Sequence, residues 1–549
     1  MKKALVVLLL FLVVFATLTT AAVKRGGYIN MTPMKQGVLV KNFNPFSPNA
    51  LEFTLGAFYE TLVYYNPMTT ETMFFLATDY EWSEDLKELT FTLRDGVEWN
   101  DGTPFTVADV LFSVNLGKEN QALDQGVLWS VQGLQKVYAA DYNKVTFQFE
   151  EVNTTVLDYF SNVYILPAHI WKDVPDPLTW TGNENPVGTG PFLYEEGSFT
   201  ELSYRVKRNP NYWKLGEDGK PLPYIDGVQF ISTTNEQAPL KFARGEYDWG
   251  GYFIANIEDT YVKADPENHK YWLPEGNLVF LNLNNLRWPF DEYKVRLAMA
   301  YAMDPEEITR IMASGAVPAS ISGLQSSYLF LAKDALDKYG VEYDPDYARE
   351  LLEEAGYRLN SKGIYERDGK ALSLKLYVPT GWTDWVIGCQ VISDQLNEIG
   401  VEAIVTQAAW PTPYKDNLFN GNYEICLGIA VTGTNPHYQF VRWVHSDNWA
   451  PLGENAGNYY GMRYKNETIT RALDAYQRTA DREEQNRLMA QVVEQFLADM
   501  PSVPLFFNPV WFEYNTKTFV GWPNADNPYA NPRPSGMDKL PILFTIHLK

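Results

Sequence analysis

The sequence predicts an α/β protein of about three domains, with a parallel sheet in its second half. The chain has 549 residues, and one domain usually takes about 100–200. A strand-like run at 372–378, a helical run at 386–399 and a second strand-like run at 401–405 follow one another. That order is typical of a right-handed βαβ unit. Hydrophobic residues make up 46% and charged residues 21% of the chain, which favours a folded globular protein over a disordered one.

The first half of the chain contains strand patterns and one well-marked helix start. Residues 89–93 and 145–149 alternate apolar and polar side chains, the pattern of half-buried strands. Thr106 precedes an apolar stripe of helical spacing, and Asp109 follows it three residues later as in a capping box. A helix is therefore predicted to begin after Thr106. The run 186–191 holds two Pro and two Gly and marks a passage between domains.

The second half gives clearer helix boundaries. Asp344 and Pro345 form an N-cap and a first-turn proline, and Gly356 ends the helix they begin. A longer helix is predicted over 481–500, where apolar residues recur on one side, and Pro501 stops it.

The first 22 residues predict a secretory signal peptide. Two lysines begin it, an apolar run follows at 4–18, and small residues suited to signal peptidase follow at 19–22. The apolar run is shorter than the about 20 residues that a membrane-spanning helix needs. No cysteine lies near the predicted cleavage site, so we expect no lipid anchor. The mature protein is expected to be exported, periplasmic or extracellular.

Charge and cysteine content exclude several classes of protein. The chain has 45 Lys and Arg against 68 Asp and Glu, a formal net charge of −23, so a polyanion such as nucleic acid is not an expected partner. Two cysteines cannot form a disulfide scaffold or a four-cysteine zinc site. Cys389 and Cys426 have largely apolar neighbours and are interpreted as core thiols, with a disulfide between them left open.

Catalytic and cofactor motifs are absent from the sequence. It contains no phosphate-binding loop, nucleophile elbow, zincin motif or EF-hand loop, and its five histidines have no metal-ligand spacing to one another. We therefore expect no metal, no cofactor and no enzymatic activity. An exported glycoside hydrolase stays open as an alternative of another class, because the abundant acids could supply its two carboxylates.

Several motifs occur in a fixed order along the mature chain. The most specific is LRDGVEWNDGTPFTVADV at 93–110. The others lie at 59–62, 188–192, 209–213, 223–228, 245–248, 289–298, 347–356 and 501–504. Together they resemble the signature of the peptide/nickel-type (family 5) extracellular solute-binding proteins of ABC importers.

The resemblance implies a periplasmic-binding-protein-like fold of the three-domain, oligopeptide-binding-protein type. Two lobes would enclose a ligand by closing around a hinge, and an extra domain would be inserted in the first lobe. The membrane permease of an ABC importer would be the partner, and a monomer is expected. The implied segments are 1–22 for the signal peptide, 23–67, 187–285 and 512–549 for domain I, 68–186 for domain II, and 286–511 for domain III, the second lobe.

The chain departs from the family's peptide binders in one segment. In those relatives an acidic residue in a segment like 433–436 holds the peptide ammonium group, but residues 428–440 here contain no Asp or Glu. Burying an ammonium group without a counter-charge costs several kcal/mol. A neutral ligand is therefore predicted: an oligosaccharide, namely a β-linked disaccharide or a short glucan or mannan fragment. A peptide remains the alternative, because an acid elsewhere, such as Asp384, could take the ammonium.

Aromatic and amide side chains are the candidate ligand-binding residues. The chain has 16 Trp and 35 Tyr, and flat aromatic rings cover the apolar face of a sugar while amides and hydroxyls satisfy its rim. Tryptophans can equally fill the core, which is the interpretation favoured for Trp410. The predicted site comprises Trp382 and Trp385 in a cleft-facing loop, Asn435 and Tyr438 as hydrogen-bonding groups, and Trp249 and Asn44 from the opposite lobe.

Overall fold

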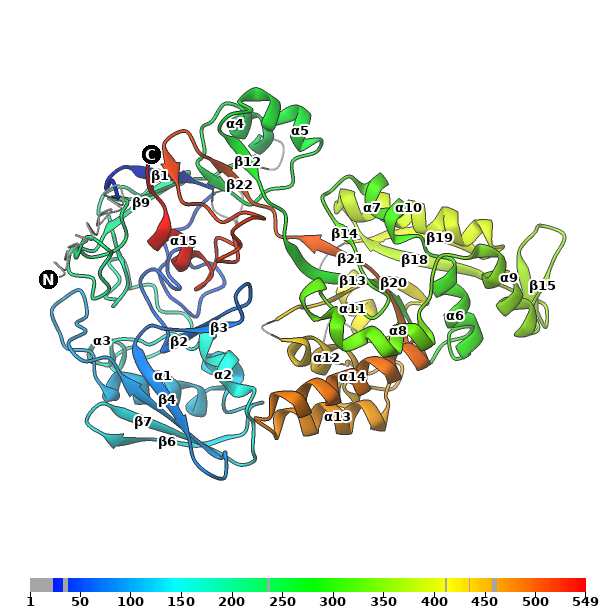
Figure 1. Ribbon diagram of the computed structural model, residues 1–549, viewed down its shortest axis with the longest axis horizontal. Coiled ribbons are helices and arrows are strands. Elements are labelled where there is room, and N and C mark those ends of the chain that lie inside the picture. Colours follow the sequence, from blue (N-terminus) through cyan, green and yellow to red (C-terminus); the bar gives the residue numbers. More distant parts are fainter. Residues whose placement is uncertain (1–22, 33–37, 235–236, 410–411, 434, 457–461) are drawn as a thin grey trace, which may run out of the picture.

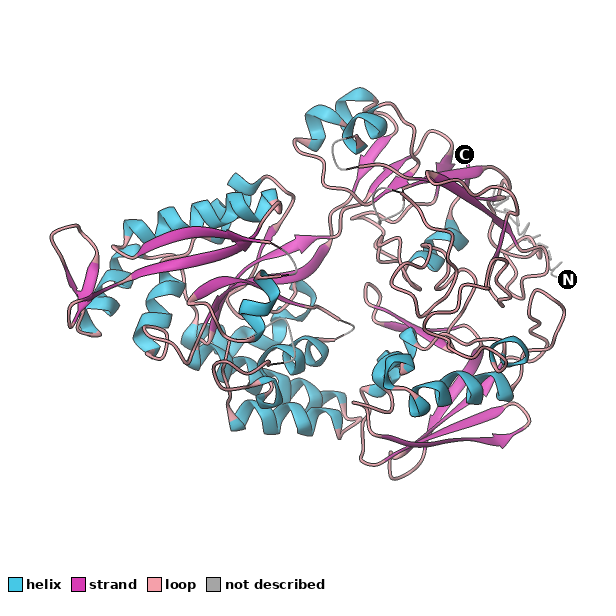
Figure 2. Cartoon of the chain, turned by 180° about the vertical axis from the view of Figure 1, so that it is seen from behind, coloured by secondary structure: helices cyan, strands magenta, loops and turns pink. Residues whose placement is uncertain are grey.

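The computed structural model forms two lobes joined by two extended segments (Figure 1; Figure 2 shows the reverse side). It describes residues 23–32, 38–234, 237–409, 412–433, 435–456 and 462–549. The predicted signal peptide and Trp410 lie outside these ranges. Within them, no helix has both the length and the apolar character needed to cross a membrane.

The first lobe is built on a seven-stranded mixed sheet whose strands come from distant parts of the chain. β1 runs parallel to β10 and β11, and the other neighbours pair antiparallel. The last strand of this sheet in sequence, β22, lies between β11 and β12, so a late segment of the chain completes a sheet that β1 begins. The order is β12 (His269–Tyr271), β22 (Glu513–Asn515), β11 (Trp249–Gly250), β1 (Tyr28–Met31), β10 (Gly227–Ile231), β9 (Ser203–Arg208) and β8 (Phe192–Tyr194).

A smaller unit is inserted in the first lobe and has its own apolar core, drawn from residues between 62 and 165. We call it the inserted unit. Two predicted strands and the predicted helix are confirmed in it, and the Thr106 backbone N–H donates to the Asp109 carboxylate at 2.8 Å. Its elements are β2 (Val63–Asn66), β3 (Glu71–Phe74), the antiparallel sheet β4 (Ala77–Trp82), β5 (Glu88–Leu93), β7 (Lys144–Phe149) and β6 (Leu134–Asp141), and the helices α1 (Val107–Glu119) and α2 (Val156–Tyr159).

The second lobe contains a six-stranded mixed sheet. The predicted βαβ unit is confirmed, because β18, α10 and β19 follow one another and the two strands pair in parallel from Ser373 opposite Glu402 to Pro379 opposite Ala408. The sheet is not parallel throughout, since β13 is antiparallel to β20 and β21. The order is β14 (Val317–Pro318), β21 (Ser502–Pro509), β13 (Glu275–Leu283), β20 (Ile425–Ala430), β18 (Ser373–Pro379) and β19 (Glu402–Ala408), with α10 at Thr383–Glu398.

Helices cover this sheet, and two of them follow the predicted boundaries. The Asp344 carboxylate accepts from the Tyr347 N–H at 2.9 Å and caps α9, and α14 ends just before Pro501. Cys389 and Cys426 are buried free thiols. The helices are α6 (Tyr293–Tyr301), α7 (Pro305–Met312), α8 (Lys333–Tyr339), α9 (Pro345–Glu354), α11 (Tyr414–Phe419), α12 (Pro436–Val444), α13 (Glu467–Gln477) and α14 (Arg482–Asp499).

The remaining elements are short, and the last helix among them is buried in the core of the first lobe. They are α3 (Ala168–Trp171), α4 (Ala238–Ala243), α5 (Ile257–Thr260), α15 (Lys539–Thr545), the three-stranded sheet β15 (Arg358–Leu359), β16 (Tyr365–Arg367) and β17 (Lys370–Ala371), and the pair β23 (Phe519–Val520) and β24 (His547–Leu548).

Two chain crossings connect the lobes, and they hydrogen-bond to each other. The Trp272 N–H donates to the Phe512 carbonyl and the Val510 N–H donates to the Pro274 carbonyl, both at 2.9 Å. The predicted boundary after residue 285 places β13 in the first lobe, but β13 pairs within the second-lobe sheet. The hinge therefore consists of two paired segments, 272–274 and 510–512.

Candidate ligand-binding site

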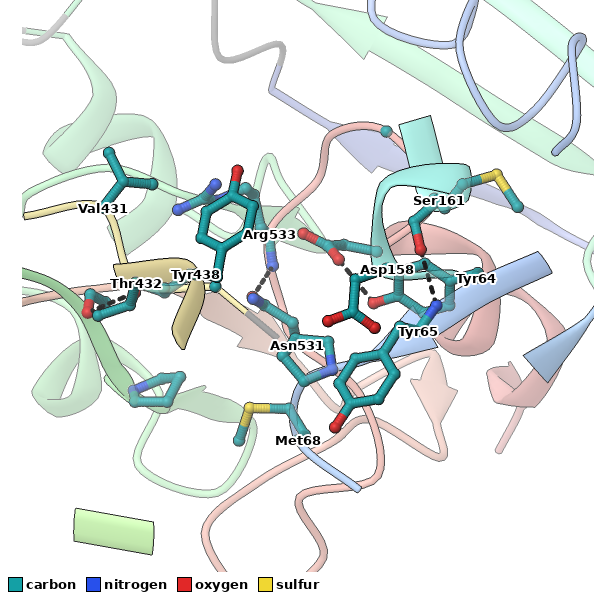
Figure 3. Close-up of a pocket in the computed structure, with 18 of the residues that line it drawn as sticks. Tyr64, Tyr65, Met68, Asp158, Ser161, Val431, Thr432, Tyr438, Asn531 and Arg533 are labelled. Carbon is teal, nitrogen blue, oxygen red and sulfur yellow. Dashed lines mark hydrogen bonds between the residues drawn. The ribbon is translucent and has the colours of Figure 1, made fainter. Parts of the chain in front are cut away.

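A cavity of about 530 Å³ lies between the lobes, within the range of about 300–1,000 Å³ typical of small-molecule sites. Its walls come from the β2–β3 hairpin, the segment around α2, the C-terminal segment 531–538 and three segments of the second lobe. Figure 3 shows Val431, Thr432 and Tyr438 on one side of it and Tyr64, Tyr65 and Asp158 on the other.

The first-lobe wall is held by hydrogen bonds between its own residues. The Tyr64 hydroxyl donates to the Asp538 carboxylate at 2.6 Å, and the Tyr65 N–H donates to the Ser161 hydroxyl at 2.9 Å. Burial raises the pKa of the Asp538 carboxyl, while the Tyr64 hydrogen bond and the Arg533 charge act in the opposite direction. The hydroxyl bond of Tyr64 fixes its aromatic side chain, and the backbone bond of Tyr65 fixes the strand that carries the second ring.

Part of the second-lobe wall is the acid-free segment that follows β20. Val431, Thr432 and Gly433 line the cavity. The Thr432 hydroxyl donates to the Gly276 carbonyl at 3.0 Å, and its N–H donates to the Asn277 side-chain oxygen at 3.3 Å. These bonds tie the wall to β13, so it moves with the second lobe as one body.

Tyr438 lies in the first turn of α12 and is fixed from several sides. The backbone of Gly433 passes so close that a Cβ atom there would lie 2.1 Å from the tyrosine ring. The Arg442 guanidinium lies 3.6 Å from the ring centroid, and the Tyr159 ring of the inserted unit lies 5.7 Å away. The Asn435 side chain caps the helix by accepting from the Tyr438 N–H at 3.0 Å. Tyr438 therefore has one well-defined position in the wall.

The cavity carries more negative than positive side chains. Among the described lining residues, Asp158, Glu275 and Asp538 face one cation, Arg533. Ser326 donates to Glu275 through both its N–H, at 3.0 Å, and its hydroxyl. An anionic ligand is disfavoured in such a field, whereas hydroxyl and N–H donors find acceptors. No group of three His, Cys, Asp or Glu among the described residues is placed to hold a metal ion.

The structure brings two of the predicted site residues to this cavity. Tyr438 lines it directly. Asn435 lies behind the wall, where its amide donates to the Asp158 carboxylate at 2.6 Å, and Asp158 lines the cavity. Asn435 thus positions a lining residue across the gap between the inserted unit and the second lobe.

The expected loop around Trp382 and Trp385 is wrong. Helix α10 already begins at Thr383, so Trp385 lies in its first turn and Trp382 at its N-cap. Trp385 is 2% exposed within the second-lobe core, and the half-buried Trp382 packs edge-on against it at 4.9 Å. Asp384 in the first turn favours the helix through its interaction with the helix dipole. Neither tryptophan is among the described residues that line the cavity.

Trp249 and Asn44 are also placed away from the cavity. Trp249 is 0% exposed, and its ring packs against Phe512 in the first-lobe core. Asn44 is 1% exposed, and its amide donates to the carbonyls of Pro177 and Trp180 at 2.7 and 2.9 Å. Trp249 therefore stabilises the first-lobe core, and Asn44 links first-lobe loops to each other.

Most of the lining was not foreseen from the sequence. Tyr64, Tyr65, Asp158 and Arg533 reach the cavity from segments that are distant in sequence. No periodicity or spacing links them, because the fold alone brings these segments together. The available signal was indirect: the abundance of tyrosine predicts amphipathic binding surfaces without locating them.

Comparison with known proteins identifies the family. Residues 73–451 match the bacterial extracellular solute-binding proteins, family 5 (middle region). The chain belongs to this family. Its family 5 relatives include a probable ABC transporter-binding protein of Deinococcus radiodurans, 26% identical over 452 residues that cover 72% of each chain.

Solved structures resemble the family 5 chain over nearly its full length. An oligopeptide ABC transporter, periplasmic oligopeptide-binding protein of Thermotoga maritima is 28% identical, with a TM-score of 0.84 over 96% of this chain and 99% of that one. The mannohexaose-bound structure of the Thermotoga protein is 27% identical, with a TM-score of 0.77 and the same coverage. The predicted periplasmic-binding-protein-like fold is confirmed.

Family 5 membership also sets the general role of the chain. It is an extracellular solute-binding protein of an ABC importer, and its relatives bind solutes rather than catalyse reactions. The glycoside hydrolase alternative has no support among them. The cavity between the lobes is accordingly a candidate site for solute capture.

Proposed function

We propose that this family 5 protein captures an oligosaccharide in the cavity between its lobes and delivers it to the membrane permease of an ABC importer. The ligand class is a β-linked disaccharide or a short glucan or mannan fragment. The observation that carries the proposal is the segment after β20, in which Val431, Thr432, Gly433 and Tyr438 line the cavity without an acid. The relative with mannohexaose bound, 27% identical to this chain, supports the same ligand class.

The lining chemistry suits a sugar. A sugar ring has an apolar C–H face and a rim of hydroxyls, and tyrosine offers both an apolar ring and a hydroxyl. Tyr65 and Tyr438 contribute rings from the two lobes, while Thr432 and Asn531 contribute neutral polar groups. Asp158 adds a carboxylate that accepts hydroxyl donors.

Capture follows from rotation about the paired hinge segments, 272–274 and 510–512. The described conformation matches the two Thermotoga structures with different TM-scores, 0.84 and 0.77 with mannohexaose, which supports more than one arrangement of this fold. A closed, loaded form is then the one presented to the permease. Under this proposal the mature protein is an exported monomer freed of residues 1–22, without lipid anchor, metal or cofactor.

A peptide is the second candidate ligand, because specific groups in the cavity suit one. Asp158 or Glu275 could accept a peptide ammonium group, and Arg533 could pair with a carboxylate. Asp158 already accepts from Asn435 at 2.6 Å, and Glu275 from Ser326 at 3.0 Å. A peptide would compete with these internal bonds, which is why the neutral ligand is preferred.

A thermal-shift panel on ligand-stripped mature protein tests the proposal. Manno-, cello-, laminari- and xylo-oligosaccharides are compared with di- to pentapeptides. A ligand that binds only the native state raises the melting temperature. At a ligand concentration 100-fold above Kd, it adds about 2.7 kcal/mol to the free energy of unfolding. We expect a shift with one sugar series and none with peptides. A shift with peptides alone would overturn the sugar assignment.

A further inference from the structure

The inserted unit and the second lobe touch each other on the side of the cavity away from the hinge. Helix α2 of the inserted unit meets α12 along its length: the N-cap Asn435 donates to Asp158 at 2.6 Å, and Arg442 in the last turn donates to the Tyr159 hydroxyl at 3.4 Å. We call these contacts the clasp. Figure 1 shows the inserted unit reaching the second lobe beside α13, opposite the hinge strands.

A second contact runs alongside the clasp and uses backbone groups. The Thr154 N–H donates to the Gln477 carbonyl at 2.8 Å, and the Thr154 hydroxyl donates to the Thr479 carbonyl at 2.9 Å. The hinge on one side and these contacts on the other close a ring of protein around the cavity. The inserted unit is therefore part of the enclosure.

Clasp residues and cavity-lining residues overlap. Asp158 and Tyr438 both line the cavity, and both are held by groups of the clasp. The Arg442 guanidinium lies 3.6 Å from the Tyr438 ring centroid and 5.5 Å from that of Tyr159. The two rings, one from each side of the gap, are 5.7 Å apart. Forming the clasp thus sets the positions of two groups that face the ligand.

We propose that the clasp is coupled to ligand binding, with Asn435, Arg442 and Tyr159 as positioning residues for Asp158 and Tyr438. The proposal deepens the proposed function and rests on it in taking the cavity as the ligand site. Apparent affinity scales with the fraction of molecules in the binding-competent state. Loosening the clasp lowers that fraction and hastens ligand release, although none of the three residues needs to touch the ligand.

Two substitutions test this coupling. Arg442→Met removes the cation between the rings. Asn435→Ser keeps a good helix cap but is too short to bond Asp158. The matched control is Lys370→Met. Lys370 also lies over an aromatic ring, 3.6 Å from the centroid of Trp288. It belongs to β17 of the small sheet at the far end of the second lobe (Figure 1).

The measurements are the radius of gyration of the ligand-free protein in solution and the Kd and dissociation rate of the best ligand from the panel. We expect both clasp variants to be more extended and to bind about three- to thirty-fold more weakly, since a lost cation–π contact in Arg442→Met and a lost hydrogen bond in Asn435→Ser each fall in that range. The loss should come mostly from faster dissociation, and Lys370→Met should match the parent. Tyr159→Phe, which removes only the hydroxyl, is the gentler variant should Arg442→Met fail to fold.

The possible outcomes separate the two proposals. Unchanged Kd in both clasp variants overturns the coupling, even if the ligand-free protein becomes more extended. If only peptides bind and the variants weaken that binding, the sugar assignment fails and the coupling stands. If neither sugars nor peptides bind, the radius of gyration of the clasp variants decides. An unchanged radius overturns the proposal that the clasp holds the inserted unit to the second lobe, and an increased radius supports it.

Discussion

Tyr438 combines the features expected of a ligand-contacting side chain. It lines the cavity, belongs to the acid-free segment and is held in position by Gly433 and Arg442. An aromatic contact contributes about 0.5–1.5 kcal/mol beyond its buried area. The side chain is also only partly buried and lies outside the apolar core of the second lobe, so its loss opens little of that core.

We predict that Tyr438→Ala weakens ligand binding by at least about tenfold, since 1.4 kcal/mol is a factor of ten, with little change in melting temperature. Isothermal titration with the best sugar measures the effect. Tyr438→Phe should lose less, because it keeps the ring. Tyr142→Ala, at a side chain 75% exposed on the inserted unit, is the control. Equal affinities for Tyr438→Ala and the parent would remove Tyr438 from the site.

Trp385 shows how an element decides what a residue does. Because α10 begins at Thr383, the ring of Trp385 is carried into the core between α10 and the sheet, where its indole N–H points to the Asn508 side-chain oxygen at 3.4 Å. Trp382, the N-cap residue of the helix, is half-buried and packs against the Trp385 ring. The helix start, not the residue type, separates a core tryptophan from a cleft tryptophan.

We predict that Trp385→Ala destabilises the protein by about 3–5 kcal/mol, the usual cost of a large-to-small change in a core. Trp382→Ala should cost clearly less. Urea unfolding followed by circular dichroism measures both. A Trp385→Ala protein of parental stability that has lost sugar binding would contradict this assignment and restore the ring to the binding site.

Elements with strong local signals were predictable from the sequence, whereas most of the cavity lining other than Tyr438 was not. The βαβ unit over 372–405 and the capped helix after Asp344 were found because period and caps are local properties. The start of α10 was missed because Gly381 and Thr383 resemble loop residues. The cavity is lined by Tyr65, Asp158 and Arg533, which come from three segments far apart in the sequence. No local sequence pattern predicts that these segments lie together in the fold.

Buried acids set how the stability of the whole molecule depends on pH. Glu513 on β22 is 0% exposed. One of its carboxylate oxygens accepts from the Tyr252 N–H at 3.1 Å, and the other has no hydrogen-bond partner among the described residues. Burial raises its pKa to about 8. Burial likewise raises the pKa of Glu60 to about 7 and that of Asp248 to about 6.

These shifts predict that stability falls as pH rises. A carboxyl whose pKa is raised in the folded state keeps its proton there after the unfolded chain has released its own, so its contribution is complete below about pH 4 and is lost as pH approaches the folded pKa. Each pH unit in that window costs about 1.4 kcal/mol per group. For Glu513 the window extends from about pH 4 to about pH 8.

We predict that Glu513→Gln flattens this pH dependence and stabilises the protein at pH 8 relative to the parent. Melting temperatures from pH 5 to 8 measure the effect. Glu196→Gln, at an exposed site of the first lobe, should follow the parent curve. Parallel curves for Glu513→Gln and the parent would mean that Glu513 is ionised in the folded protein.

The position of β22 between β11 and β12 has a consequence for biosynthesis. The second-lobe sheet uses strands between Glu275 and Pro509, so a growing chain holds all of that sheet before the first-lobe sheet has its strand β22. β12 has no neighbour in the first-lobe sheet until Glu513–Asn515 has been made. The lobe whose strands are synthesised first is thus the last to be completed, because β12 stays unpaired in a nascent chain until the ribosome has nearly finished.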